Sequence, residues 1–145
     1  MIEYRKVSLI RRLWAIVYDL ILLAAILMIA SGLATSLLYF VTGSSDSSKY
    51  NLLMTLWLLF AGFLYYGISW KVSGQTVGMR TWRFRVLNAD GSHLSLQQSF
   101  YKYILTIILF SSLIGFIWLL FDKNKRTLYD ILTDTIFVNE KPLKK

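Results

Sequence analysis

Three long and nearly uncharged apolar stretches limit what this chain can fold into. They cover 29, 21 and 22 residues: Leu13–Val41, Leu52–Val72 and Phe100–Phe121. Each contains one charged residue, respectively Asp19, Lys71 and Lys102. The hydrocarbon core of a bilayer is about 30 Å thick and is crossed by about 20 apolar residues in a helix. The sequence therefore predicts an all-α integral membrane protein, with a single domain over residues 1–145.

The composition excludes several other classes of protein. Hydrophobic residues make up 56% of the chain and charged residues 17%, against about 25% charged residues in soluble domains. Leu13–Val41 is too long for the apolar region of a signal peptide, which has roughly 7–15 residues. With no Cys and one His (His93), we expect no disulfide, metal site or cofactor. No nucleophile and base occur in a convincing arrangement, so we do not expect an enzyme.

The segments outside the apolar stretches contain short predicted elements. Thr81–Leu87 alternates apolar and basic residues and runs into a turn, as a strand entering a hairpin would. Thr135–Val138 is a second strand-like run, and a two-stranded sheet formed by these segments would be a small cytoplasmic β element. Thr127–Leu132 predicts a short amphipathic helix in the C-terminal tail, residues 122–145.

The distribution of Lys and Arg predicts the topology. Basic residues collect in cytoplasmic segments, which places the N-terminus, the loop over residues 73–99 and the tail in the cytoplasm. Three full crossings would put the basic tail outside. We therefore favour two full transmembrane helices and a third segment that is broken or re-entrant, turning back within Ser111–Gly115. A third full crossing is the alternative.

The basic residues also indicate the partners. The net charge is +8, but the basic side chains flank the spans and do not form one nucleic-acid-sized patch. Anionic lipid headgroups of the bilayer are the expected partner, and nucleic acid is not. A membrane chain of this size cannot easily enclose a transport pathway. Transport would therefore require a homo-oligomer or a membrane partner.

Asp19 is the most informative single residue. A charge in the apolar part of a span costs about 2.5–3.5 kcal/mol on insertion scales and usually marks a function. Asp19 could exchange protons, or it could clamp helices together through a salt bridge. Arg12 lies two helical turns before it, about 10.5 Å away and too far for direct contact. Arg12 could instead act only as an orientation-setting charge. Arg80, Lys102 and Arg126 are the other candidate cations for Asp19.

Asp130 has two possible roles. It could reach Arg12 at the cytoplasmic boundary, or it could stabilise the first turn of a helix that begins near Thr127.

The arrangement of these residues resembles the RDD family of membrane proteins, which is named for an arginine and two aspartates. Arg12, Asp19 and Asp130 match that pattern. Further similarity lies in Gly74-Gln75-Thr76-Val77-Gly78-Met79-Arg80, in Arg85–Gly91, and in Arg126–Asp130 with Thr135. Tyr129 stands where the family usually has His, and Lys102 matches a basic residue often found near the start of the third segment. Gln75, Thr76, Arg80, Lys102 and Arg126 are therefore supporting site candidates.

The resemblance implies a protein of the bacterial inner membrane, and the distribution of Lys and Arg predicts a multi-pass topology with both termini cytoplasmic. Transport is suggested for the family, and cation/proton antiport is reported for some members. We therefore expect a small transporter or transporter subunit in which Asp19 exchanges a proton for a cation. The alternative is a non-catalytic accessory subunit that stabilises a larger membrane or envelope complex.

Overall fold

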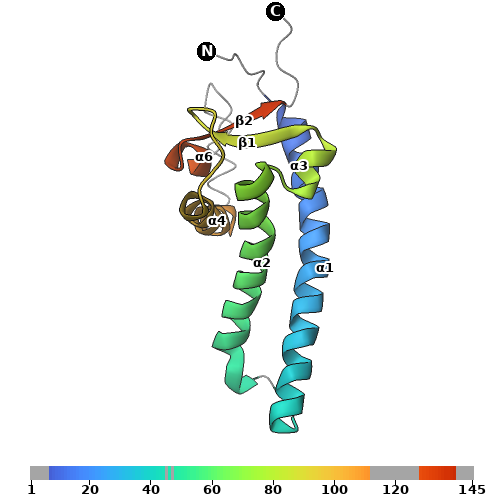
Figure 1. Ribbon diagram of the computed structural model, residues 1–145. Coiled ribbons are helices and arrows are strands. Elements are labelled where there is room, and N and C mark those ends of the chain that lie inside the picture. The colour runs from blue at the N-terminus through green and yellow to red at the C-terminus, as the bar shows by residue number, and fades with distance from the viewer. Residues whose placement is uncertain (1–6, 45, 47, 112–127, 140–145) are drawn as a thin grey trace, which may run out of the picture.

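The computed structural model describes residues 7–44, 46, 48–111 and 128–139. Two long helices lie side by side and antiparallel, α1 (Leu9–Thr42) and α2 (Asn51–Ser73), and the short 3-10 helix η1 (Ser48–Tyr50) precedes α2 (Figure 1). The helix α1 ends at Gly43 and α2 ends at Gly74, both in the left-handed conformation. This is a common way to end a helix. Both are long and apolar enough to cross a membrane, as predicted for residues 13–41 and 52–72.

The surface of this helical hairpin suits lipid. Only three of the 34 residues of α1 are buried: Ala15, Asp19 and Ala30. Large apolar side chains are exposed along both helices, among them Phe40 at 87%. The helices meet where the Trp57 indole N–H donates to the Ala30 carbonyl at 2.9 Å. Apolar side chains exposed to this extent are favourable in acyl chains and unfavourable in water.

Four short elements form a cap at the N-terminal end of α1 and the C-terminal end of α2 (Figure 1). They are α3 (Val77–Thr81), β1 (Phe84–Asn88), α6 (Leu128–Leu132) and β2 (Thr135–Asn139). The two strands pair antiparallel, with Val86 opposite Phe137. β1, β2 and α6 lie in the segments for which the sequence predicts two strands and a short C-terminal helix, whereas α3 was not predicted. Phe84 and Val86 are buried in the cap's core, together with Leu94, Trp70 and Tyr103.

The predicted limits of the first strand are wrong at its start. Thr81 is the last residue of α3, and the strand begins only at Phe84. The Thr76 hydroxyl accepts a hydrogen bond from the Met79 N–H at 3.2 Å and so caps α3. Arg83 then has a φ of 55°, and this left-handed residue separates helix from strand. Trp82 belongs to that turn, although it continues the alternating pattern.

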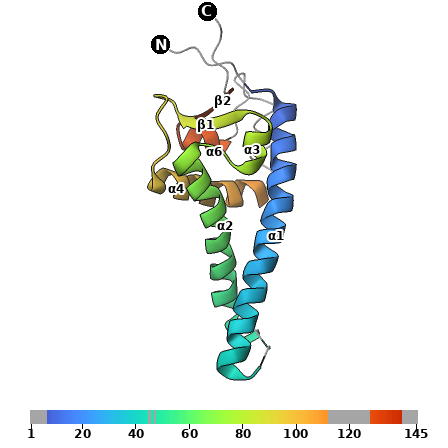
Figure 2. The same ribbon diagram turned by 45° about the vertical axis from the view of Figure 1, so that its right-hand side comes forward.

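The third apolar stretch begins with a helix, α4 (Leu96–Ser111), that lies across α1 and α2 and not alongside them. It is seen nearly end-on in Figure 1 and from the side in Figure 2. The chain is helical up to Ser111, and residues 112–115, where the bend is predicted, lie outside the described residues. Lys102 explains part of this orientation, because its side chain is buried under the cap and holds α4 against it.

Candidate functional site

Asp19 is held by three hydrogen-bond donors from two other parts of the chain. The Tyr65 hydroxyl of α2 donates to one carboxylate oxygen at 2.6 Å. The Thr76 hydroxyl donates to the other oxygen at 2.5 Å, and the Gly78 N–H donates to the first at 2.8 Å. We call this set the Asp19 cradle. It joins α1 to α2 and α3, and Asp19 is 3% exposed within it.

Gly78 allows α3 to approach α1 closely enough to form the cradle. A Cβ atom at this position would collide with the backbone carbonyl oxygen of Ala15 and would lie 2.9 Å from the Asp19 carboxyl carbon. A larger residue would push α3 away and lengthen the Gly78 hydrogen bond. The glycine is therefore needed for its lack of a side chain.

A salt bridge is one of the two roles considered for Asp19, and Arg126, one of its candidate cations, lies outside the described residues. Within the described part of the chain Asp19 has no ion pair, and all its donors are neutral. Hydrogen bonds to a charged acceptor are stronger than those between neutral groups. Two hydroxyls and one backbone N–H can therefore stabilise this carboxylate.

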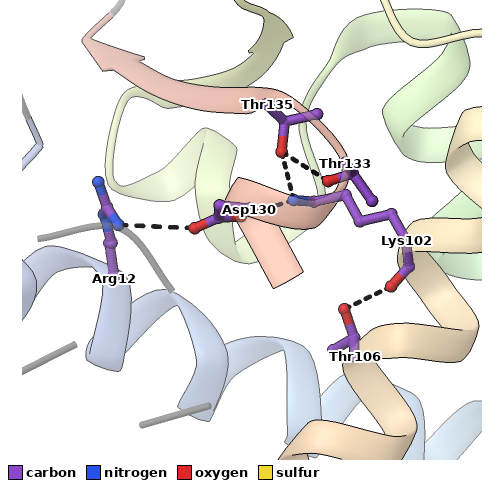
Figure 3. A network of polar contacts seen from close by, with 6 residues as sticks. All are labelled: Arg12, Lys102, Thr106, Asp130, Thr133 and Thr135. Carbon is purple, nitrogen blue, oxygen red and sulfur yellow. Dashed lines mark hydrogen bonds and ion pairs between the residues drawn. The ribbon is translucent and has the colours of Figure 1, made fainter. Parts of the chain in front are cut away.

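A second buried cluster surrounds Lys102 at the junction of α4, α6 and β2 (Figure 3). The Lys102 ammonium lies 2.6 Å from the Asp130 carboxylate and 2.7 Å from the Thr135 hydroxyl. The Thr133 hydroxyl is 3.0 Å from that of Thr135. Arg12 approaches the other Asp130 oxygen at 3.9 Å. We call these five residues the Lys102 cluster; in it Lys102 and Asp130 are each 1% exposed.

Two aromatic rings complete the surroundings of the ammonium. Lys102 Nζ lies 5.5 Å from the centre of the Phe137 ring and 5.9 Å from that of Trp70. The Arg12 guanidinium lies 4.5 Å from the same Phe137 ring. Aromatic faces attract cations, so Phe137 stabilises both positive charges on one ring. The ammonium thus sits among a carboxylate, a hydroxyl and two ring faces.

The electrostatics of this cluster favour proton loss from Lys102. Burial lowers the pKa of Lys102, the charge of Asp130 opposes that shift, and the charge of Arg12 adds to it. The direction is downward because removing an ammonium from water is costly unless its partners compensate fully. Lys102 lies in α4, outside the two long helices, and it is the cation of the cluster that can lose a proton.

The structure places the other predicted site residues as follows. The Gln75 amide donates to the Phe84 carbonyl at 2.8 Å and ties the loop after α2 to β1. Thr76 belongs to the Asp19 cradle. Arg80 is exposed on α3 and, in the chain as described, joins neither set of contacts. Arg126 lies outside the described residues. Arg12 and Asp19, matched together by the family pattern, belong to two different clusters.

Several contributors were missed by sequence reasoning. Tyr65 contacts Asp19, and Trp70 and Phe137 face the Lys102 ammonium, but the sequence analysis gives none of them a role. Thr is a favoured N-cap residue, and Thr76 caps α3, but the sequence has Met79 where a capping box would have Glu or Gln. No sequence signal indicates that Tyr65 faces Asp19, because that depends on how α1 and α2 pack. Among residues 7–44, 46, 48–111 and 128–139, no three His, Cys, Asp or Glu side chains converge on a metal site.

Comparison with known proteins identifies a family for this chain. No curated protein and no solved structure matches the chain. The RDD family matches it over residues 6–134, a range that includes the Asp19 cradle and most of the Lys102 cluster. This chain belongs to the RDD family of membrane proteins.

Proposed function

We propose that this protein is a transporter subunit of the bacterial inner membrane that exchanges a monovalent cation for a proton. One observation carries the proposal: the Lys102 ammonium occupies a buried site whose ligands would also suit a free cation. Ionisable groups buried in membrane proteins are costly and commonly mark such functions. The exchanging group in this proposal is Lys102 with Asp130, in place of Asp19.

The proposed exchange is electroneutral at the site, because one proton leaves for each monovalent cation that binds. The Lys102 ammonium releases a proton and becomes a neutral amine, which leaves the Asp130 carboxylate without its closest cation. A monovalent cation then binds Asp130 and the Thr135 hydroxyl oxygen, both of which are hard oxygen ligands. Reprotonation of Lys102 restores the ammonium and expels the cation. The lowered pKa of Lys102 supports the first step.

The size of the protein bears on how it would work. Two candidate membrane helices do not enclose a pathway, so transport would need further copies of this chain or a membrane partner. The exposed apolar faces of α1 and α2 are compatible with either. In this proposal the basic cap lies in the cytoplasm and both termini are on that side.

An accessory role is the second candidate, and the Asp19 cradle favours it. Every donor in the cradle connects one element to another, as expected of a clamp. A protein whose buried polar groups all serve as clamps would stabilise a larger complex and would carry no cation itself.

Reconstitution into proteoliposomes separates these two functions. We expect wild-type protein to move protons when a monovalent cation gradient is applied, measured with a pH-sensitive dye. Lys102→Gln removes the titratable group and should reduce the flux to that of empty liposomes. Lys71→Gln, an exposed lysine at the end of α2, is the matched control and should behave as wild type. Absence of flux from well-incorporated wild-type oligomers would refute transport by this chain alone, and co-purification of one stoichiometric membrane partner would then favour the accessory role.

A further inference from the structure

The helix α4 has its polar side buried and its apolar side exposed. Ser99 and Lys102 are fully buried, beneath the cap. Over residues 96–108 the exposed side chains are almost all apolar, and their spacing places them on one continuous arc of the helix: Leu96, Phe100, Tyr101, Ile107 and Ile108. Gln97 is the polar exception, in the first turn. A soluble protein would orient such a helix in the opposite way.

The number of residues along α2 shows at what depth in the bilayer α4 would lie. Asn51 to Trp70 is 20 residues, which in a helix is about 30 Å and so equals the thickness of the hydrocarbon core. Lys102 lies against Trp70, at the cap end of that length. From the same helix, Tyr103 extends back along α2 and donates to the Leu59 carbonyl at 2.9 Å. The polar side of α4 is therefore at the membrane boundary, and Tyr103 reaches into the apolar region.

The exposed arc of α4 continues the apolar surface of the hairpin. The Phe100 ring contacts the Phe63 ring of α2 edge-on, with centres 5.4 Å apart. Figure 2 shows the cap on one side of α4 and the body of the hairpin on the other. Since the hairpin surface already requires acyl chains around it, acyl chains also reach the arc beside it.

We infer that α4 lies in the plane of one membrane interface, with its apolar arc in the acyl chains of that leaflet and the cap on the headgroup side. Helices with one apolar face insert in this way to a depth of about 5–10 Å. Here the polar face is covered by protein in place of water. The first half of the third apolar stretch would thus anchor the cap to the membrane surface without crossing it. This inference does not depend on the proposed transport activity.

Depth measurements on the whole chain in bilayers test the inference. Single cysteines at Leu96 and Ile107 in this Cys-free sequence would carry a fluorophore, with quenching by lipids brominated at successive acyl positions. The two positions are 11 residues apart, about 16 Å along the helix. An in-plane α4 gives both labels the same shallow depth and strong quenching.

The matched control is a pair with the same spacing on α2, Leu53 and Leu64, which are both exposed. This pair should show clearly different depths, because α2 runs through the bilayer. Different depths for Leu96 and Ile107, comparable to those of the α2 pair, would overturn the inference. Protection of both α4 labels from brominated lipid would also overturn it, since another protein surface would then cover the arc.

Discussion

At the scale of single residues, Asp19 shows how neutral donors stabilise a carboxylate in a candidate membrane helix. Three donors approach it from α2 and from the segment that starts α3, and none of them is charged. The charge is thus balanced by hydrogen bonds whose geometry fixes three elements relative to each other. Asp19 is therefore a residue whose loss should loosen the cap's attachment.

Replacement of Asp19 distinguishes this role from a salt bridge. Asp19→Asn keeps an oxygen for Tyr65 and Gly78, and its amide can donate to the Thr76 hydroxyl, so we expect a loss of about 1 kcal/mol. Asp19→Ala leaves three buried donors without an acceptor, at about 1–3 kcal/mol each, and should lower the unfolding temperature strongly. Thermal unfolding in detergent, followed by tryptophan fluorescence, measures both effects.

Lys71→Gln, at the exposed lysine near the end of α2, serves as the control and should leave the unfolding temperature unchanged. Equal destabilisation by Asp19→Asn and Asp19→Ala would contradict the neutral cradle and would indicate a stranded cation. If the proposed function is right, the Asp19→Asn protein still carries out proton-coupled flux, whereas the Lys102→Gln protein does not.

At the scale of elements, the β1–β2 pair holds the cap together and can be tested by cross-linking. Leu87 lies directly opposite Ile136, and directly paired residues have Cβ atoms about 4.5–5.5 Å apart, near the spacing of a disulfide. We expect the Leu87→Cys, Ile136→Cys double variant to form an intramolecular disulfide on mild oxidation. Faster migration on a non-reducing gel would detect it.

The control pair shifts one cysteine by two residues along the strand. Leu87→Cys with Val138→Cys places the sulfurs on a diagonal, roughly 7–8 Å between the residues, and should oxidise poorly. Equal oxidation of the two pairs would mean that the register differs from the one described.

Some of these elements could be predicted from the sequence, for physical reasons that differ between them. Leu13–Val41 and Leu52–Val72 were recognised because a bilayer imposes both length and apolarity on a span, and both are helices in the structure. The first strand could be predicted because apolar and basic residues alternate in Thr81–Leu87 with the period of two that a strand has. The helix α3 was not predicted, because five residues give no periodic signal. The contact between Lys102 and Asp130 was not predicted either, since it joins α4 to the cap across a long stretch of sequence.

At the scale of the whole molecule, the hairpin and the cap define two ends that should lie on opposite sides of the membrane. Ser44, in the loop between α1 and α2, and Ser92, in the loop after β1, are both exposed. Each can be replaced by a single cysteine. In intact cells we expect a membrane-impermeant thiol reagent to label position 44 and not position 92. Permeabilised cells should show labelling at both sites. Labelling of position 92 from outside would mean that the orientation in the membrane is the reverse of the one proposed.

The separation of β1 from β2 along the chain sets an order of assembly. The ligands of Asp19 are complete once the ribosome has made residue 78, whereas Asp130 and Thr135 follow Lys102 by 28 and 33 residues and are synthesised later. Closing so long a loop is slower than forming local contacts. The hairpin can therefore be inserted and locked to α3 while β1 still waits for its partner strand. We therefore expect the Lys102 ammonium to stay hydrated until Asp130 and Thr135 have been made and can bury it.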